Sequence, residues 1–263
     1  MSRLAGTFSR IRNGGRGGLV TYLTAGDPDA DRSAALLVAV ARAGADVLEV
    51  GVPFSDPLAD GPVIQRASER ALAGGMSLRG ALEIVRRVRA DVDTPIVLFT
   101  YANPVVRMDP VVFASTAADA GVDGVLVLDY PVEEAEPLRA PLVDAGLDPI
   151  FLISPTTSDE RIRKSAALGA GFLYVISRLG VTGVRDRLPE DVGTLMARVR
   201  ACADLPVALG FGIANPEQVA EACRVADAAV VGSALVNVVA EHAASSNVCA
   251  QASEYVQWLK KSL

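Results

Sequence analysis

The chain has 263 residues, of which 51% are apolar and 21% are charged, and its formal net charge at pH 7 is −6. This composition supports a large buried core and excludes extensive disorder, and the length suits one large α/β domain or two ordinary ones. The negative charge excludes a broadly basic surface of the kind that binds nucleic acid or an anionic membrane. The longest apolar run, residues 34–41, is too short to cross a bilayer. We therefore expect small-molecule chemistry.

The cysteines and the single histidine restrict that chemistry further. Cys202, Cys223 and Cys249 are odd in number and widely spaced, which indicates reduced, buried thiols in a cytoplasmic protein. His242 is the only histidine and is expected at the surface near a helix end, so catalytic triads that use histidine and histidine-rich metal sites are excluded. The N-terminus carries arginines but no apolar signal core, and its apolar residues at 4, 8 and 11 suit one face of an amphipathic helix.

Short apolar runs alternate with helical patterns along the whole chain. We expect strands at residues 19–24, 47–51, 96–100, 124–128, 149–153, 172–176, 206–210 and 228–232. We expect helices at residues 30–43, 62–73, 78–90, 110–120, 132–145, 158–168, 190–202, 216–223, 234–243 and 248–260. Gly44, Gly121 and Gly146 each end a helix shortly before a strand, and each is followed two residues later by an aspartate.

Eight strand-then-helix units in a chain of this length predict an α/β fold, a single (β/α)8 barrel. We expect one barrel domain over residues 1–263. An extra helix at the N-terminus and extra helices in the loops after the second and eighth strands complete the predicted architecture.

The stretch of residues 48–62 organises the candidate site. Glu49 interrupts an apolar strand, where a carboxylate is desolvated and therefore requires a function or a partner. The loop that follows carries Asp56 and Asp60 and ends at Pro62, which suits the first turn of a helix. Two carboxylates in different environments can have different pKa values, so one can act as an acid while the other stays ionised. For Asp56 and Asp60 the alternative is an ordinary turn or cap role.

In a (β/α)8 barrel the active site forms at the carboxyl ends of the strands, which predicts the residues that share it. Besides Glu49 and Asp60, these are Thr24, Gly26, Asp27, Tyr101, Asn103, Asp129 and Tyr174. For Asp27 and Asp129 a cap or turn is an equal alternative, and Tyr174 can also be a core residue. Glycine-rich turns let backbone N–H groups approach a phosphate. The candidate phosphate donors are Gly183, Gly212, Gly232 and Ser233.

Six motifs, in order over nearly the whole chain, resemble those of the tryptophan synthase α subunit family. They are GDP at 26–28, EVGVPFSDPLADGP at 49–62, YANP at 101–104, YVISRLGVTG at 174–183, GFGI at 210–213 and GSA at 232–234. The resemblance implies a lyase of tryptophan biosynthesis that cleaves indole-3-glycerol phosphate to indole and glyceraldehyde 3-phosphate. This retro-aldol reaction needs no metal and no organic cofactor. Leu179 is bulkier than the small residue that the family pattern has at that position. This difference affects the loop after the sixth strand and leaves the implied chemistry unchanged.

The resemblance also implies a role for each site residue. Glu49 would protonate the indole at C3 and help to deprotonate the glycerol hydroxyl. Asp60 would hold the indole N–H and stabilise the positive charge of the intermediate, while Tyr22 and Phe211 would flank the indole. The other implied substrate contacts are Tyr101, Tyr174, Thr182, Gly183, Gly212, Gly232 and Ser233, the last four of them at the phosphate.

A partner is implied as well: a β subunit that carries pyridoxal phosphate, forms an α2β2 complex and receives indole through a tunnel. The residues implied to face it are Pro53, Asp56, Asn103 and Pro104, with Asp56 as the coupling residue. Two other hypotheses stand beside this one. An enzyme of the same chemistry could release free indole without a partner, and a catalytically silent barrel could act only as an activator. Other phosphate-binding barrels would explain the glycine-rich turns but not the acidic stretch.

Overall fold

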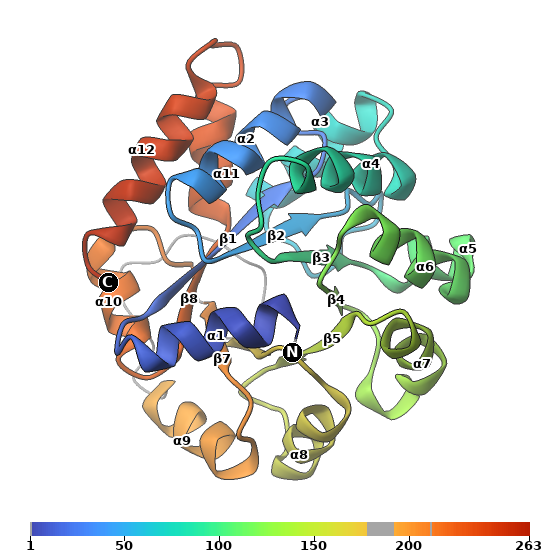
Figure 1. Cartoon of the computed structure of the whole chain (residues 1–263), viewed down its shortest axis with the longest axis vertical. Coiled ribbons are helices and arrows are strands. Elements are labelled where there is room, and N and C mark those ends of the chain that lie inside the picture. The colour runs from blue at the N-terminus through green and yellow to red at the C-terminus, as the bar shows by residue number, and fades with distance from the viewer. Residues whose placement is uncertain (1, 178–191, 211) are drawn as a thin grey trace.

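The computed structural model describes residues 2–177, 192–210 and 212–263, and within them eight parallel strands close into a barrel in chain order (Figure 1). The strands are β1 (Gly18–Thr24), β2 (Val47–Gly51), β3 (Ile96–Thr100), β4 (Gly124–Val127), β5 (Asp148–Ile153), β6 (Leu173–Ile176), β7 (Val207–Gly210) and β8 (Ala228–Val231). Each lies within one residue of its predicted bounds at either end, because strands buried on both faces read as apolar runs in the sequence. The predicted (β/α)8 fold is confirmed.

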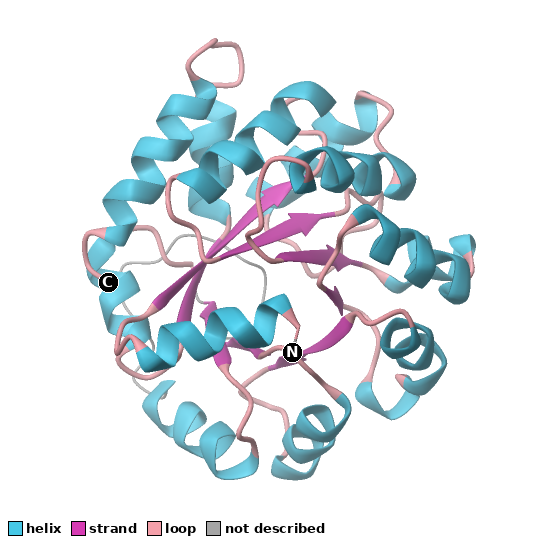
Figure 2. Cartoon of the chain, in the orientation of Figure 1, coloured by secondary structure: helices cyan, strands magenta, loops and turns pink. Residues whose placement is uncertain are grey.

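Helices form the outer layer around the strands (Figure 2). They are α1 (Arg3–Asn13), α2 (Ala30–Arg42), α3 (Pro62–Ala73), α4 (Leu78–Arg89), α5 (Ala102–Met108), α6 (Pro110–Ala120), α7 (Glu136–Asp144), α8 (Asp159–Leu168), α9 (Val192–Cys202), α10 (Pro216–Cys223), α11 (Ser233–Glu241) and α12 (Val248–Lys260). Capping side chains begin several of them; for example, Asp29 accepts a hydrogen bond from the Arg32 N–H. The predicted extra helices are present as α1, as α3 after β2, and as the α11–α12 pair after β8.

Helix α1 closes the end of the barrel at which the strands begin. In Figure 1 it crosses the near end of the strands. Leu4, Phe8 and Ile11 on one face of α1 pack with inward-facing strand residues, and the Phe8 and Phe172 rings lie 5.1 Å apart. This end is therefore filled by apolar side chains, which leaves the carboxyl ends of the strands as the open end for a site.

Two helical predictions differ from the structure. Helix α5 was not expected. The side chain that caps its first turn comes from a distant part of the chain: Asp129, after β4, accepts a hydrogen bond from the Ala102 N–H at 2.7 Å. The helix expected over 132–145 is divided into a 3-10 turn, η1 (Val132–Glu134), and α7. Pro137 explains the break, because it has no N–H to donate to Glu133 and its ring would clash with that carbonyl in a continuous helix.

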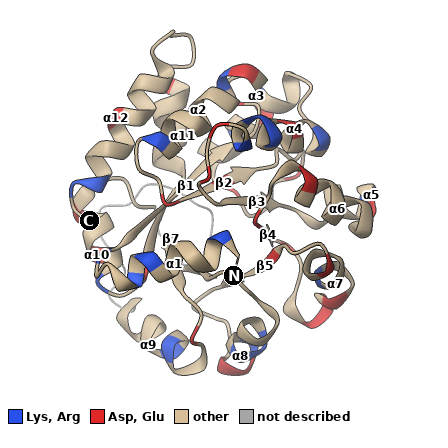
Figure 3. Ribbon diagram, viewed as in Figure 1, with Lys and Arg blue, Asp and Glu red and all other residues tan. Residues whose placement is uncertain are grey.

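The cysteines and the surface charge agree in part with expectation. The three cysteines are free, but each is half-buried rather than fully buried. In the view of Figure 3, basic and acidic residues are interspersed over the helices. Among the described residues, no helix is both long and apolar enough to span a membrane.

Candidate active site

Glu49 lies inside the barrel, near the carboxyl end of β2. Its neighbours in register are Tyr22 on β1 and Val97 on β3. Val47 packs in the apolar interior, so Glu49, two residues further along the strand, projects to the same side. The carboxyl group is fully buried, and neither oxygen has a hydrogen-bond partner among the described residues. This desolvation raises the pKa of Glu49 from 4.5 to about 8.

Asp60 has a different environment. It is buried in the loop after β2, and one carboxylate oxygen accepts a hydrogen bond from the Tyr101 hydroxyl at 3.1 Å. Gln65 on α3 holds the Asp60 backbone by donating to its carbonyl at 2.9 Å. Burial raises the pKa of Asp60 to about 6, although the Tyr101 hydrogen bond acts to lower it. At pH 7 Asp60 is therefore mostly ionised and Glu49 mostly protonated, the division of roles that acid–base chemistry needs.

Three aromatic side chains line the interior beside the two carboxyl groups. Phe99 on β3 contacts both tyrosines, with ring centroids 5.4 Å from Tyr22 and 6.2 Å from Tyr174. Burial raises the pKa of both tyrosines well above 10, and the charges of Asp60 and Glu49 act on each of them in the same direction. The barrel thus brings two acids and two phenols from three different strands and one loop to one place.

Phe99 was missed in the sequence, although a signal for it exists. It lies two residues after Val97, which is in register with Glu49, and alternation along a strand directs both side chains inward.

Gly51, at the end of β2, lies directly against Tyr22. A Cβ at this position would lie 2.0 Å from the Tyr22 hydroxyl. A glycine at the end of β2 is therefore required by the position of Tyr22.

The candidate phosphate donors that the structure describes lie after β7 and β8. Gly212 has a φ of +88°, a conformation that favours glycine. Gly232 precedes α11, whose first residue is the buried Ser233, and no side chain caps this helix start. A Cβ on Gly232 would lie 3.5 Å from the Tyr22 Cβ, which places this turn next to the aromatic interior. Helix starts of this kind favour anions.

Three predicted substrate contacts lie outside the described residues. They are Thr182, Gly183 and Phe211, and Leu179 falls in the same segment as the first two.

Asp27 and Asp129 have the structural roles that the sequence left open. Asp27 is buried and pairs with Arg70 on α3 through two hydrogen bonds of 2.8 Å, which ties the loop after β1 to the helix after Asp60. Asp129 caps α5, as described above. Neither carboxylate joins the cluster around Glu49.

The four residues expected to face a partner lie on two adjoining segments. Pro53 and Asp56 belong to the loop after β2, while Asn103 and Pro104 belong to the first turn of α5. Tyr101 joins the segments, since its ring centroid lies 5.1 Å from that of Phe54 and its hydroxyl accepts from the Ala59 N–H at 3.2 Å. The same hydroxyl donates to Asp60. Tyr101, which directly precedes α5, therefore links the start of that helix to Asp60.

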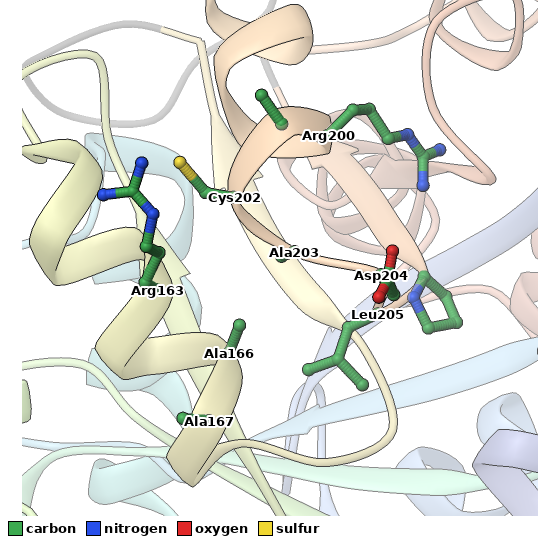
Figure 4. A pocket seen from close by; sticks show the side chains of 10 residues that line it. Arg163, Ala166, Ala167, Arg200, Cys202, Ala203, Asp204 and Leu205 are labelled. Carbon is green, nitrogen blue, oxygen red and sulfur yellow. The ribbon is translucent and has the colours of Figure 1, made fainter.

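A separate surface pocket lies between α8 and α9 and is unrelated to this site. Arg163, Cys202 and Leu205 are among its lining residues (Figure 4). It adjoins the residues that lead into β7, at the end of the barrel opposite to Glu49 and Asp60. Barrel enzymes carry their chemistry at the other end, so we do not assign the active site to this pocket.

Comparisons with known proteins agree with the geometry. The family model described as tryptophan synthase alpha chain matches residues 8–263. Tryptophan synthase alpha chains from Burkholderia thailandensis and Gluconacetobacter diazotrophicus are 48% and 52% identical to this chain, covering 100% and 90% of it and 97% and 86% of the relatives. The solved tryptophan synthase subunit alpha from Legionella pneumophila superimposes with a TM-score of 0.90 at 36% identity, over 100% of this chain and 98% of that one.

The function of this family is to cleave indole-3-glycerol phosphate and to pass the indole to a β subunit, as a lyase of tryptophan biosynthesis. The matches extend over nearly the full length of the chain, and the barrel places a buried acid at the expected end. This chain belongs to the tryptophan synthase alpha chain family.

Proposed function

We propose that Glu49 and Asp60 carry out the cleavage of indole-3-glycerol phosphate in this chain, with Glu49 as the acid–base group and Asp60 as the electrostatic partner. The observation that carries the proposal is the state of Glu49. It is a fully buried carboxyl group without a hydrogen-bond partner among the described residues, and its pKa is about 8. A buried polar group without a partner is costly to folding, so a functional reason is expected.

The proton transfers and the charge stabilisation that the reaction requires can be supplied by these two groups. Protonated Glu49 gives its proton to C3 of the indole ring, and Asp60, ionised at pH 7, stabilises the positive charge that develops at the ring nitrogen. The Glu49 carboxylate then removes the proton of the glycerol hydroxyl. The O–H electrons form the aldehyde C=O bond, and the electrons of the breaking C–C bond return to the ring to give indole. Glu49 ends protonated, as it began.

Binding of the substrate is assigned to the remaining candidates. Gly212, Gly232 and Ser233 would hold the phosphate through backbone N–H groups and the start of α11, together with Gly183. Tyr22 and Tyr174 would contact the indole with Phe211, and Tyr101 would orient Asp60. Thr182 would contact Asp60, as the resemblance to the family implies. Binding energy gained at the phosphate, remote from the reacting bond, orients that bond for cleavage.

The β subunit is the proposed protein partner, and the pyridoxal phosphate of the complex would belong to it. This chain would need neither a metal nor an organic cofactor for the cleavage itself. The loop after β2 and the start of α5 supply a suitable surface, because Leu58 is 89% exposed and Val106 is 56% exposed close to the candidate interface residues. The proposed interface consists of Pro53, Asp56, Asn103 and Pro104.

We place the reaction in the cytoplasm, where free cysteines stay reduced.

The test is indole release from indole-3-glycerol phosphate by the purified chain, alone and with a β subunit added. Weak activity alone that rises with the β subunit supports the coupled enzyme. Fast activity that does not respond to the β subunit would support the independent lyase instead. Absence of indole in both mixtures, combined with a faster β reaction, would support the silent activator and refute the catalytic assignment.

A further inference from the structure

Both backbone polar groups of one residue, the N–H and C=O of Ala214, are held by side chains from the outer helices. The Ala214 N–H donates to Oε1 of Gln218 on α10 at 2.7 Å. The Tyr255 hydroxyl on α12 donates to the Ala214 carbonyl, also at 2.7 Å. Tyr255 is 41 residues further along the chain, so this second contact depends on how α12 packs against the barrel.

Ala214 lies in the short connection between β7 and α10, two residues after Gly212. The described part of this connection runs from Gly212, whose φ is positive, through the buried Ile213 to Asn215, whose side chain caps α10 by accepting from the Gln218 N–H. Fixing Ala214 at both its N–H and its C=O therefore limits rotation of the backbone that joins Gly212 to α10.

We propose that Tyr255 is a positioning residue for the substrate phosphate. It acts through the Ala214 carbonyl and, with Gln218, fixes the direction of the Gly212 backbone before the substrate arrives. This inference rests on the proposed function, which assigns Gly212 to the phosphate. If the loop is already ordered in the free protein, it loses less conformational entropy when the substrate binds. A residue that holds the loop in place therefore contributes to substrate affinity without contacting the substrate.

The contribution of the Tyr255 hydroxyl can be separated from the packing of α12. Ala252, Val256 and Leu259 anchor this helix by burying their side chains completely. The Tyr255 ring itself packs on Trp258, with centroids 5.7 Å apart. Tyr255→Phe keeps this ring contact and removes only the donor to Ala214.

For Tyr255→Phe we expect KM for indole-3-glycerol phosphate to rise about three- to tenfold, the factor that corresponds to one net hydrogen bond, with little change in kcat. The dissociation constant of inorganic phosphate, measured by calorimetry with the purified chain, should rise by a similar factor. Gln257→Ala is the matched control, since Gln257 is exposed on α12, two residues from Tyr255. It should leave both constants unchanged.

Unchanged KM and phosphate affinity in Tyr255→Phe would overturn the inference while leaving the proposed function intact. The inference would also fail if kcat and KM changed together with a loss of thermal stability and the control behaved in the same way, because the residue would then be structural only. Failure of the proposed function has a separate signature, the absence of indole formation by the wild-type chain with and without a β subunit.

Discussion

Replacing Glu49 by Gln is expected to abolish indole formation and, at the same time, to remove a loss of stability that the wild type undergoes as the pH rises. The amide cannot transfer the proton, so activity is lost. The stability effect follows from the raised pKa of Glu49, because the folded state binds its proton more tightly than the unfolded chain does. The wild type therefore loses stability as the pH rises from about 4.5 to about 8, and Glu49→Gln does not.

The structure gives the size of this effect. The pKa of Glu49 is raised from 4.5 to about 8 by burial alone. Since one pKa unit corresponds to about 1.4 kcal/mol, ionisation of Glu49 lowers wild-type stability by less than about 1 kcal/mol at pH 5, about 3 kcal/mol at pH 7 and about 5 kcal/mol above pH 8.5. The buried Gln amide has its own desolvation cost, but that cost does not depend on pH.

Urea unfolding of the wild type and of Glu49→Gln at pH 5, 7 and 8.5, followed by circular dichroism, measures the difference in unfolding free energy. This difference should shift in favour of the variant by about 2 kcal/mol or more between pH 5 and pH 7. Glu254→Gln, a change at an exposed glutamate on α12, is the control and should show no such trend. A difference that stays constant across the three pH values would refute the account of Glu49 as a buried, desolvated acid.

Asp60→Asn is expected to lower kcat for indole release by about a hundredfold or more, because the charge proposed at the indole nitrogen is lost; an unchanged kcat would exclude that role. With pKa values of about 6 and about 8 for Asp60 and Glu49, wild-type kcat/KM should fall below pH 6 and above pH 8, and a flat profile over this range would contradict the assignment. Gly51→Ala should cost about 1–3 kcal/mol in thermal unfolding and raise KM, because the new Cβ meets the buried Tyr22 hydroxyl; a silent substitution would mean that Tyr22 can move aside. Burial opposes ionisation of Asp227, but hydrogen bonds from Arg12, the Val207 N–H and Arg200 outweigh it and lower its pKa, so its stabilising effect is complete above about pH 4 and is lost in more acidic solution. Asp227→Asn should therefore destabilise the chain by about 2 kcal/mol at pH 7, and this difference should shrink as the pH falls through the lowered pKa of Asp227, as measured by urea unfolding.

The strands and the barrel could be predicted from the pattern of apolar residues alone. A parallel strand that is covered on both faces needs an uninterrupted apolar run, so the pattern that identifies a strand is also the one that buries it. Glu49 was recognisable for the same reason, since a carboxylate stands out in such a run. Phe99 could have been found by the same alternation that orients Glu49, whereas α5 could not, because the side chain that caps it comes from the end of β4.

Which acids share the site depends on how the barrel closes. Glu49 stands out within its apolar strand, but Asp27, Asp60 and Asp129 all lie in loops after strands, where no local pattern distinguishes a site residue from a cap or a turn. Closure of the barrel gave Asp27 an arginine from α3 and gave Asp129 a helix start, while it left the Glu49 carboxyl group without a partner among the described residues. The pKa of a carboxyl group depends on solvent and on neighbours within a few ångströms, and most of these neighbours come from elements that are distant in the sequence.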